Sequence, residues 1–387
     1  IGMMVVSASA AGFDDFSDKD EIVNKDAVSM LTTLGVINGK EDGSYFDPTG
    51  NVTRAEMAKM IATVLNQGAD VDGLYVGMNT GLTDVKGHWA ESYINYCYSL
   101  GIIAGRGNGK FDPAATVTGN EAAKMLLVAA GYDAQLEGLT GADWAIKTAS
   151  LASTLGIFDN LSVATSDPLT RDNAALLIYN ALDIEMIQKY ENGYAIAFTD
   201  HRTILADKYG VIKVQGVVVA NEWASLASDD GDAALKEGKT TIYNGEGIFS
   251  TTGNTTVSKE DASLKTQTFN VSTPVDMLGK TVNLYIKKTT ILADSTVYGD
   301  PVVSDVNTVV TTGDTVLYSG AKDPQVDYDK LLGENGLTDK DAKYFWNYNS
   351  GKYIPNTTEK YGDKTANVKG ATLTIIDNNG DGEVDYV

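Results

Sequence analysis

The sequence holds 387 residues, of which 43% are hydrophobic and 21% are charged, so it is long enough for two or three globular domains. Its formal net charge of -22 argues against binding nucleic acid or an anionic membrane through a broad basic surface. An anionic ligand would have to be held by individually placed cations. The single cysteine excludes disulfides within the chain, and two histidines are too few for most zinc or triad chemistry.

Residues 1–12 have the composition expected of the tail of a secretory signal. An apolar run leads into the small residues Ala8-Ser9-Ala10, which follow the pattern of a cleavage site. No charged segment precedes them, so the signal would be cropped, and the alternative is an ordinary terminus. No later stretch approaches the ~20 apolar residues that span a bilayer. We therefore expect a secreted protein without a transmembrane segment.

Three copies of one unit are expected within residues 13–187, at about 13–70, 80–133 and 138–187. In each copy a helical apolar stripe ends at a glycine, a turn follows, and a threonine then starts a second helix. These threonines are Thr53, Thr118 and Thr170. Glu56 and Glu121 follow the first two at capping-box spacing. One such unit cannot bury its apolar face alone, whereas three packed about a common axis can.

The third copy is the most divergent. Asp167-Pro168 is what we expect to remain of its turn, and its last helix is expected to run to about Ile187.

The motifs shared by the units are specific in combination. They are Phe-x-Asp, Trp-Ala, Gly-Ile/Val-Ile-x-Gly, Gly-x-Phe-Asp-Pro and Thr-Arg-Ala-Glu. This pattern resembles the S-layer homology domain, which is normally found in threes on proteins of the bacterial cell surface. The resemblance covers residues 13–187 and implies a pseudo-threefold helical bundle. It also implies grooves between units that bind secondary cell-wall polysaccharide, often carrying pyruvate ketals, or peptidoglycan-linked groups.

The resemblance also implies which residues line those grooves: Arg54, Glu56, Arg171, Trp89, Trp144, Asp18 and Asp84. An arginine fork meets the carboxylate of a pyruvate ketal with two parallel bonds. At the first turn of a helix the anion would also meet the helix dipole and free backbone N–H groups. The alternatives are local salt bridges for the arginines and core packing for the tryptophans.

Two departures from the motif reduce the expected number of grooves. Gly119 stands where the arginine of the second unit should be, and Asn173 replaces the glutamate of the third. We therefore expect one or two competent grooves.

Residues 188–387 change from helical stripes to strand-like runs, which predicts a mostly antiparallel β region, a barrel or a sandwich, and an α+β class for the chain. The expected strands are Val211–Ala220, Thr241–Tyr243, Val282–Lys287, Thr308–Thr311, Thr315–Tyr318 and Thr372–Ile376. Short helices are expected at Tyr328–Leu332 and Asp339–Phe345. Because the sequence ends in an apolar strand, we expect the natural protein to continue past Val387.

A loop near the C-terminus has the ligand spacing of a calcium-binding loop. Asp377, Asn379, Asp381, Glu383 and Asp385 occupy positions 1, 3, 5, 7 and 9 of such a loop. The bidentate glutamate of position 12 would lie beyond Val387, and a strand rather than a helix is expected before the loop. The alternative, which we favour, is a β-hairpin turn built on Asn-Gly-Asp-Gly. Beyond this possible Ca²⁺ site, no cofactor is expected to be required.

No nucleophile elbow, zinc-protease motif or phosphate-binding loop is present in the sequence. We therefore expect a non-enzymatic protein. The resemblance implies that it belongs to the cell wall or S-layer and binds wall polysaccharide or a peptidoglycan-linked polymer and, in a surface lattice, other copies of itself. The alternatives are a wall-anchored enzyme and an adhesin whose activity resides in the β region.

Overall fold

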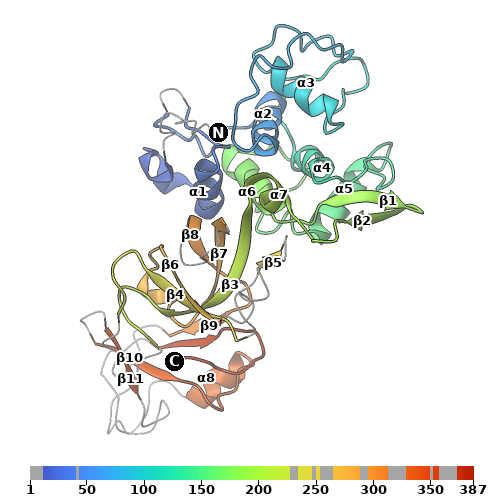
Figure 1. The fold of residues 1–387 in the computed structure, drawn as a ribbon. Coiled ribbons are helices and arrows are strands. Elements are labelled where there is room, and N and C mark those ends of the chain that lie inside the picture. Colours follow the sequence, from blue (N-terminus) through green and yellow to red (C-terminus); the bar gives the residue numbers. More distant parts are fainter. Residues whose placement is uncertain are drawn as a thin grey trace. The chain divides into compact units, whose positions relative to one another are not determined.

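The computed structural model describes residues 12–40, 43–226, 234–245, 250–252, 265–287, 295–312, 328–348, 352–356 and 373–387. The chain divides into two compact units (Figure 1). The first comprises Ile1–Ile212 and Thr252–Thr255, and the second Lys213–Thr251 and Thr256–Val387. The first unit thus runs past residue 187, where the sequence predicted the change to a β region. The suggested signal tail lies almost wholly outside the described residues.

Three helix pairs form the first unit. They are α1 (Lys25–Thr33) with α2 (Arg54–Leu65), α3 (Glu91–Ser99) with α4 (Gly119–Ala129), and α5 (Trp144–Thr154) with α6 (Arg171–Ala181). The first helix of each pair ends at a left-handed glycine, Gly35, Gly101 or Gly156, each with φ between 72° and 78°. Only glycine adopts this conformation without steric cost, which explains why each helix stops there.

The expected threonines begin the second helix of each pair. The hydroxyls of Thr53 and Thr118 accept from the backbone N–H of Glu56 and Glu121, and both capping boxes are complete. Thr170 caps α6 by accepting from the N–H of Asn173. The prediction of these three helix starts is confirmed.

The pairs are interleaved rather than self-contained. Helix α3 packs on α2, α5 packs on α4, and α1 packs on α6. The residues before the capping threonines, Val52, Val117 and Leu169, are fully buried and close a ring of backbone bonds. The N–H of Val52 donates to Leu169, that of Leu169 to Val117, and that of Val117 to Val52, each at 2.9 Å. Each pair therefore buries its apolar face against the other two.

The first unit also contains elements that the sequence did not predict, both before α1 and after α6. Two short 3₁₀ helices, η1 (Phe13–Asp15) and η2 (Lys19–Glu21), precede α1. After α6 come the hairpin β1 (Ile187–Glu191) with β2 (Tyr194–Ala197) and helix α7 (Ile204–Tyr209). The expected extension of α6 to Ile187 is wrong, because Ile187 pairs with Ala197 in the hairpin and its N–H donates to Ala130.

Antiparallel sheets dominate the second unit, which confirms the α+β class. The largest sheet has the order β6-β4-β3-β7-β8, with β5 also paired to β3. Its strands are β3 (Val211–Ala220), β4 (Thr240–Tyr243), β5 (Ser250–Thr252), β6 (Thr266–Phe269), β7 (Thr281–Lys287) and β8 (Thr296–Val303). A 3₁₀ turn, η4 (Val275–Met277), leads into β7. The smaller sheets pair β9 (Thr308–Thr311) with β12 (Thr374–Asp377), and β10 (Tyr344–Tyr348) with β11 (Lys352–Asn356).

One of the two helices expected in this region forms, as α8 (Tyr328–Glu334). The other, at Asp339–Phe345, is wrong. Asp339 accepts from the N–H of Ala342, and strand β10 starts at Tyr344, where a run of aromatic residues favours a strand over a helix. The strand expected at Thr315–Tyr318 lies outside the described residues.

Candidate functional site

The first turn of α2 is tied to the loop of the second helix pair. The N–H of Arg54 donates to the carbonyl of Ala115 at 2.8 Å, and that of Ala55 donates to Pro113 at 3.0 Å. The N–H of Glu56 donates to the Thr53 hydroxyl. The expectation that these N–H groups are free for an anion is therefore wrong, because the protein itself satisfies them.

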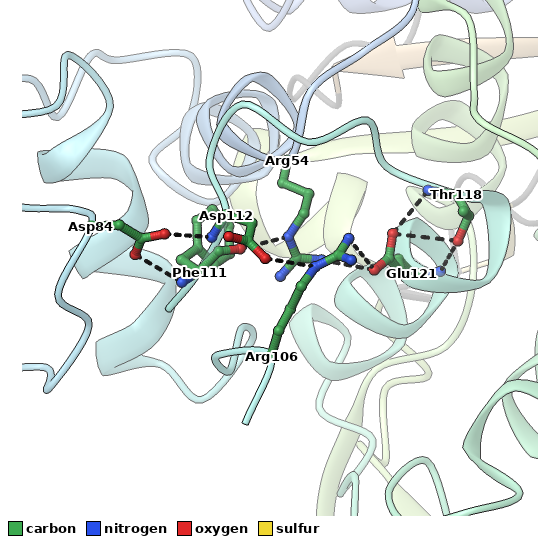
Figure 2. A network of polar contacts seen from close by, with 7 residues as sticks. All are labelled: Arg54, Asp84, Arg106, Phe111, Asp112, Thr118 and Glu121. Carbon is green, nitrogen blue, oxygen red and sulfur yellow. Dashed lines mark hydrogen bonds and ion pairs between the residues drawn. The ribbon is translucent and has the colours of Figure 1, made fainter. Parts of the chain in front are cut away.

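The side chain of Arg54 joins two helix pairs (Figure 2). It is only 6% exposed. Its Nε donates to the carbonyl of Phe111 at 2.9 Å, and its Nη1 donates to Glu121 Oε1 at 3.1 Å. The guanidinium lies 4.5 Å from the centroid of the buried Phe111 ring. Burial lowers the pKa of Arg54, and the charge of Glu121 acts in the opposite direction.

The loop beneath Arg54 is held by Asp84, whose carboxylate accepts from the N–H groups of Phe111 and Asp112, both at 2.9 Å (Figure 2). Asp18 does the same for Phe46 and Asp47, at 2.9 and 2.8 Å. Both aspartates therefore fix the loops on which the arginines rest, and Asp18 is only 8% exposed.

Arg171 repeats the arrangement between the third and first helix pairs. Its Nε donates to the carbonyl of Phe46 at 2.8 Å, its Nη2 donates to Asn38 at 3.1 Å, and its guanidinium lies 5.0 Å from the Phe46 ring. Arg54 thus makes the local salt bridge of the alternative interpretation, with Glu121, whereas Arg171 donates to loop carbonyls. We call each arginine, with the loop it holds, a clasp.

The third position has no clasp. The N–H of Gly119 donates to the carbonyl of Asp167, which corresponds to the bond from Arg54 to Ala115. The N–H of Asn120 donates to the carbonyl of Thr165, which corresponds to the bond from Ala55 to Pro113. Thr165 therefore stands at the position of the loop proline, and Val163 at that of the loop phenylalanine. The assignment of Asp167-Pro168 as the remnant of the turn is wrong by three residues. The arginine and its aromatic partner are both missing here.

Replacing Gly119 by alanine is expected to destabilise the helical unit by about 1–3 kcal/mol. A Cβ there would lie 2.9 Å from the carbonyl oxygen and 3.0 Å from the Cα of Thr165, which is backbone and cannot swing away. Urea denaturation followed by circular dichroism measures the change. Gly333 in helix α8 is the control, since an added Cβ meets nothing within 4 Å and should not destabilise. Equal stability of the Gly119 variant and the parent would contradict the packing described.

A groove of about 470 Å³ opens beside the first clasp. Arg54, Arg106, Lys124, Glu121 and Trp144 all line it, so three cations face one carboxylate. Arg106 Nη2 lies 2.9 Å from Glu121 Oε1, and its Nε lies 3.8 Å from Asp112 (Figure 2). Lys124 Nζ lies 5.5 Å from the centroid of the Trp144 ring.

The groove brings together two of the residues predicted from sequence, Arg54 and Trp144, and adds two that were missed, Arg106 and Lys124. Arg106 directly follows the Gly-Ile-Ile-x-Gly motif, and Lys124 lies three residues after Glu121, so their charge in an acidic chain was the signal that could have found them. Its walls come from all three helix pairs, which contribute Arg54, Arg106 and Trp144 in turn. The groove therefore exists only when the three pairs are assembled.

Trp89 and Glu56 lie elsewhere. Trp89 is 55% exposed and contacts the rings of His88 and Tyr93. Glu56 accepts from the N–H and hydroxyl of Thr53, both at 2.8 Å, so it serves the capping box, as Glu121 does in the next pair.

The C-terminal loop has the contacts of a tight turn. Asp377 accepts from the N–H groups of Asn379, Gly380 and Gly382, and Asp385 accepts from that of Asn378. Ile376 pairs antiparallel with Tyr386 across the turn. Within the described residues, no group of three or more His, Cys, Asp or Glu side chains is placed to hold a metal ion. The calcium site remains a prediction, and these bonds fit the hairpin alternative.

Comparison with known proteins connects this geometry to a family. The family model of the S-layer homology domain matches residues 15–58 and 81–123, which lie in the first two predicted repeats. The chain is 28% identical over 253 residues to a "Cell surface protein" of Thermoanaerobacter kivui, covering 64% of this chain and 30% of the relative. It is 24% identical over 388 residues to a "Surface-layer 125 kDa protein" of Lysinibacillus sphaericus, covering 97% of this chain and 29% of the relative.

A further relative carries an enzyme name. The chain is 32% identical over 131 residues to an uncharacterized cell wall amidase of Bacillus anthracis, covering 31% of this chain and 23% of the relative. The chain spans less than a third of each of these three relatives. No helix among the described residues has the length and apolarity to cross a membrane. Together the matches indicate a secreted protein of the bacterial cell wall or surface layer and support its anchoring there.

Proposed function

We propose, from the S-layer homology domains that this chain carries, that its helical unit anchors a secreted protein non-covalently to cell-wall polysaccharide. The groove beside Arg54 is proposed to bind an anionic sugar substituent such as a pyruvate ketal. The chain as a whole is proposed to be non-enzymatic, and its second unit to face outward or to contact other copies in a surface lattice.

The observation that carries the proposal is the charge of the groove. The protein has a net charge of -22, yet three cations and one carboxylate line this single concave surface. Arg54 has five N–H donors, and the two bonds described above use two of them. Trp144 offers the aromatic face on which a sugar ring stacks, as aromatic side chains do in binding sites.

The helix-terminal arginines alone are a weaker basis for binding than the sequence implied. Arg54 and Arg171 are both mostly buried and bonded to loop carbonyls. Replacing them would change the fold as well as the groove, so loss of binding in such variants would have two explanations. Competition by a small ligand separates the two.

Retention of the full chain on purified wall sacculi is expected to be lost in the presence of a methyl hexoside that carries a pyruvate ketal. The methyl ester of the same ketal, which has the same shape and no charge, is the control and should not compete. Retention that resists both compounds equally would contradict an anion-binding groove.

One observation favours a second candidate function, a wall-anchored enzyme. Within the second unit, a groove of about 620 Å³ is lined by Asp341, Asp381, Glu383 and Asp385, among others. Burial raises the pKa of Asp385, and neighbouring carboxylates add to the effect. A carboxyl group whose pKa is raised inside a groove lined by other carboxyl groups is a feature of sites for acid catalysis. Release of soluble fragments from peptidoglycan by the full chain, abolished in Asp385→Asn, would establish this activity in place of a purely structural role.

A further inference from the structure

Four residues of the groove and its clasp, Arg54, Arg106, Asp112 and Lys124, have equivalents around Arg171. Arg171 holds the first loop as Arg54 holds the second, and Lys40 pairs with Asp47 as Arg106 lies near Asp112. Lys59 is the equivalent of Lys124, six residues beyond the capping threonine in each case. Its Nζ lies 5.1 Å from the ring of Tyr93, where Lys124 lies over Trp144. The two copies offer an internal comparison.

The two lysines differ in the carboxylates around them. Burial lowers the pKa of Lys124, and repulsion from Arg54 lowers it further. Within the described residues neither lysine forms an ion pair with a carboxylate, and no carboxylate raises the pKa of Lys124. Lys59, by contrast, lies close enough to Asp70 to contribute to the lowered pKa of that carboxyl, although burial acts against it. Asp70 also accepts from the Tyr93 hydroxyl at 2.6 Å, which holds it beside Lys59.

The other cations of the two copies are balanced alike. Arg106 lies near Glu121 and Asp112, and Lys40 Nζ lies 2.5 Å from Asp47. Arg54 is paired with Glu121, and Arg171 interacts with Glu56 and Asp47. The distinguishing residue is therefore Asp70, which adds one carboxylate to the second copy. A half-buried cation without a carboxylate partner gains the most from an incoming anion, since charge pairing in a partly desolvated site is stronger than in water.

We propose that Lys124, held over Trp144, is the residue that binds the anionic group, and that Asp70 keeps the equivalent Lys59 from doing so. This inference rests on the proposed function and assigns it to one groove. Arg54 and Arg171 then serve mainly as clasps, and the aromatic ring beneath each lysine is the surface against which the sugar lies. The chain would bind one anionic sugar per molecule, and removal of the Asp70 charge would open a second site.

Calorimetric titration of the full chain with the methyl hexoside carrying a pyruvate ketal tests this directly. Lys124→Met is expected to weaken binding by about tenfold to a hundredfold, the loss that follows from removing one charge-assisted bond. Lys59→Met is the matched control and should change binding by less than about threefold, since a balanced charge contributes little. Lys124→Arg, which keeps the charge, should retain most of the affinity. Asp70→Asn, which can keep the bond to Tyr93, should raise the stoichiometry from one to two.

The thermal unfolding midpoint of each variant shows whether it is folded. If Lys124→Arg retains affinity and Lys124→Met does not, the loss is due to the missing charge and not to disturbed packing. Wild-type affinity in Lys124→Met, or equal losses in Lys124→Met and Lys59→Met, would overturn the inference while leaving polymer binding intact. If the wild-type chain bound neither the ketal nor wall sacculi, the proposed function would fail and the inference with it.

Discussion

Arg54→Ala is expected to lower the free energy of unfolding of the helical unit by about 2–3 kcal/mol. The substitution leaves the carbonyl of Phe111 without its donor and removes the cation that lies over the buried Phe111 ring. It also removes one of the two cations that contact Glu121. Urea denaturation followed at the helical band of the circular dichroism spectrum measures the change, because α1 to α6 all belong to this unit.

Two variants sharpen this experiment. Arg106→Ala removes the other partner of Glu121, but the Arg106 side chain is 40% exposed, so a loss below about 1 kcal/mol is expected. Arg54→Lys should not restore the stability, because an ammonium cannot donate to Phe111 and Glu121 with the geometry of a guanidinium. Equal effects of Arg54→Ala and Arg106→Ala would show that Arg54 does not act as a clasp.

Asp84→Asn is expected to destabilise the same unit by about 1–3 kcal/mol at neutral pH. Asp84 accepts two backbone N–H bonds from the loop that Arg54 rests on, and an asparagine can offer only one carbonyl oxygen to them. Although burial acts to raise the pKa of Asp84, the bonds from Phe111 and Asp112 hold it below the ordinary value of 3.8.

A carboxyl group with a lowered pKa in the folded state stabilises the fold above its unfolded pKa. This contribution is lost as the pH falls below 3.8 and through the lower folded pKa. The parent should therefore lose stability on acidification from about pH 5 to about pH 2 more steeply than Asp84→Asn. Parallel pH profiles of the two proteins would show that Asp84 does not carry this effect. Other carboxyl groups with lowered pKa values, among them Asp47, Asp70 and Glu91, remain in both proteins and contribute to the rest of the slope.

Local signals in the sequence were enough to predict where the first helix of each pair ends and where the second begins. A threonine followed by a glutamate at capping-box spacing, and a glycine after an apolar stripe, act within one turn of chain, so their structural effect is predictable from neighbouring residues. The same reasoning failed after α6, because β1 depends on contacts with Ala130 that no local pattern encodes. It also failed at Asp339–Phe345, where pairing with β11 decides the conformation.

The candidate site depends on distant contacts, and the sequence predicted it only in part. Arg54 was identified from its motif, and a local salt bridge was the alternative, but its partners Phe111 and Glu121 lie 57 and 67 residues away and could not be named from the sequence. Lys124 was not identified from the sequence as a site residue. Its importance follows from its position over Trp144, which depends on how the helix pairs assemble, and from a lowered pKa that no described carboxylate offsets.

The central claim is that the helical unit holds the protein on a wall polymer through its charge. Its most direct test is sedimentation of the full chain with purified sacculi, before and after mild acid removes the bound polysaccharide and leaves the peptidoglycan. We predict that the protein sediments with the intact sacculi and stays in solution with the extracted ones. Equal sedimentation with both would contradict the account, since the ligand would then be the peptidoglycan itself.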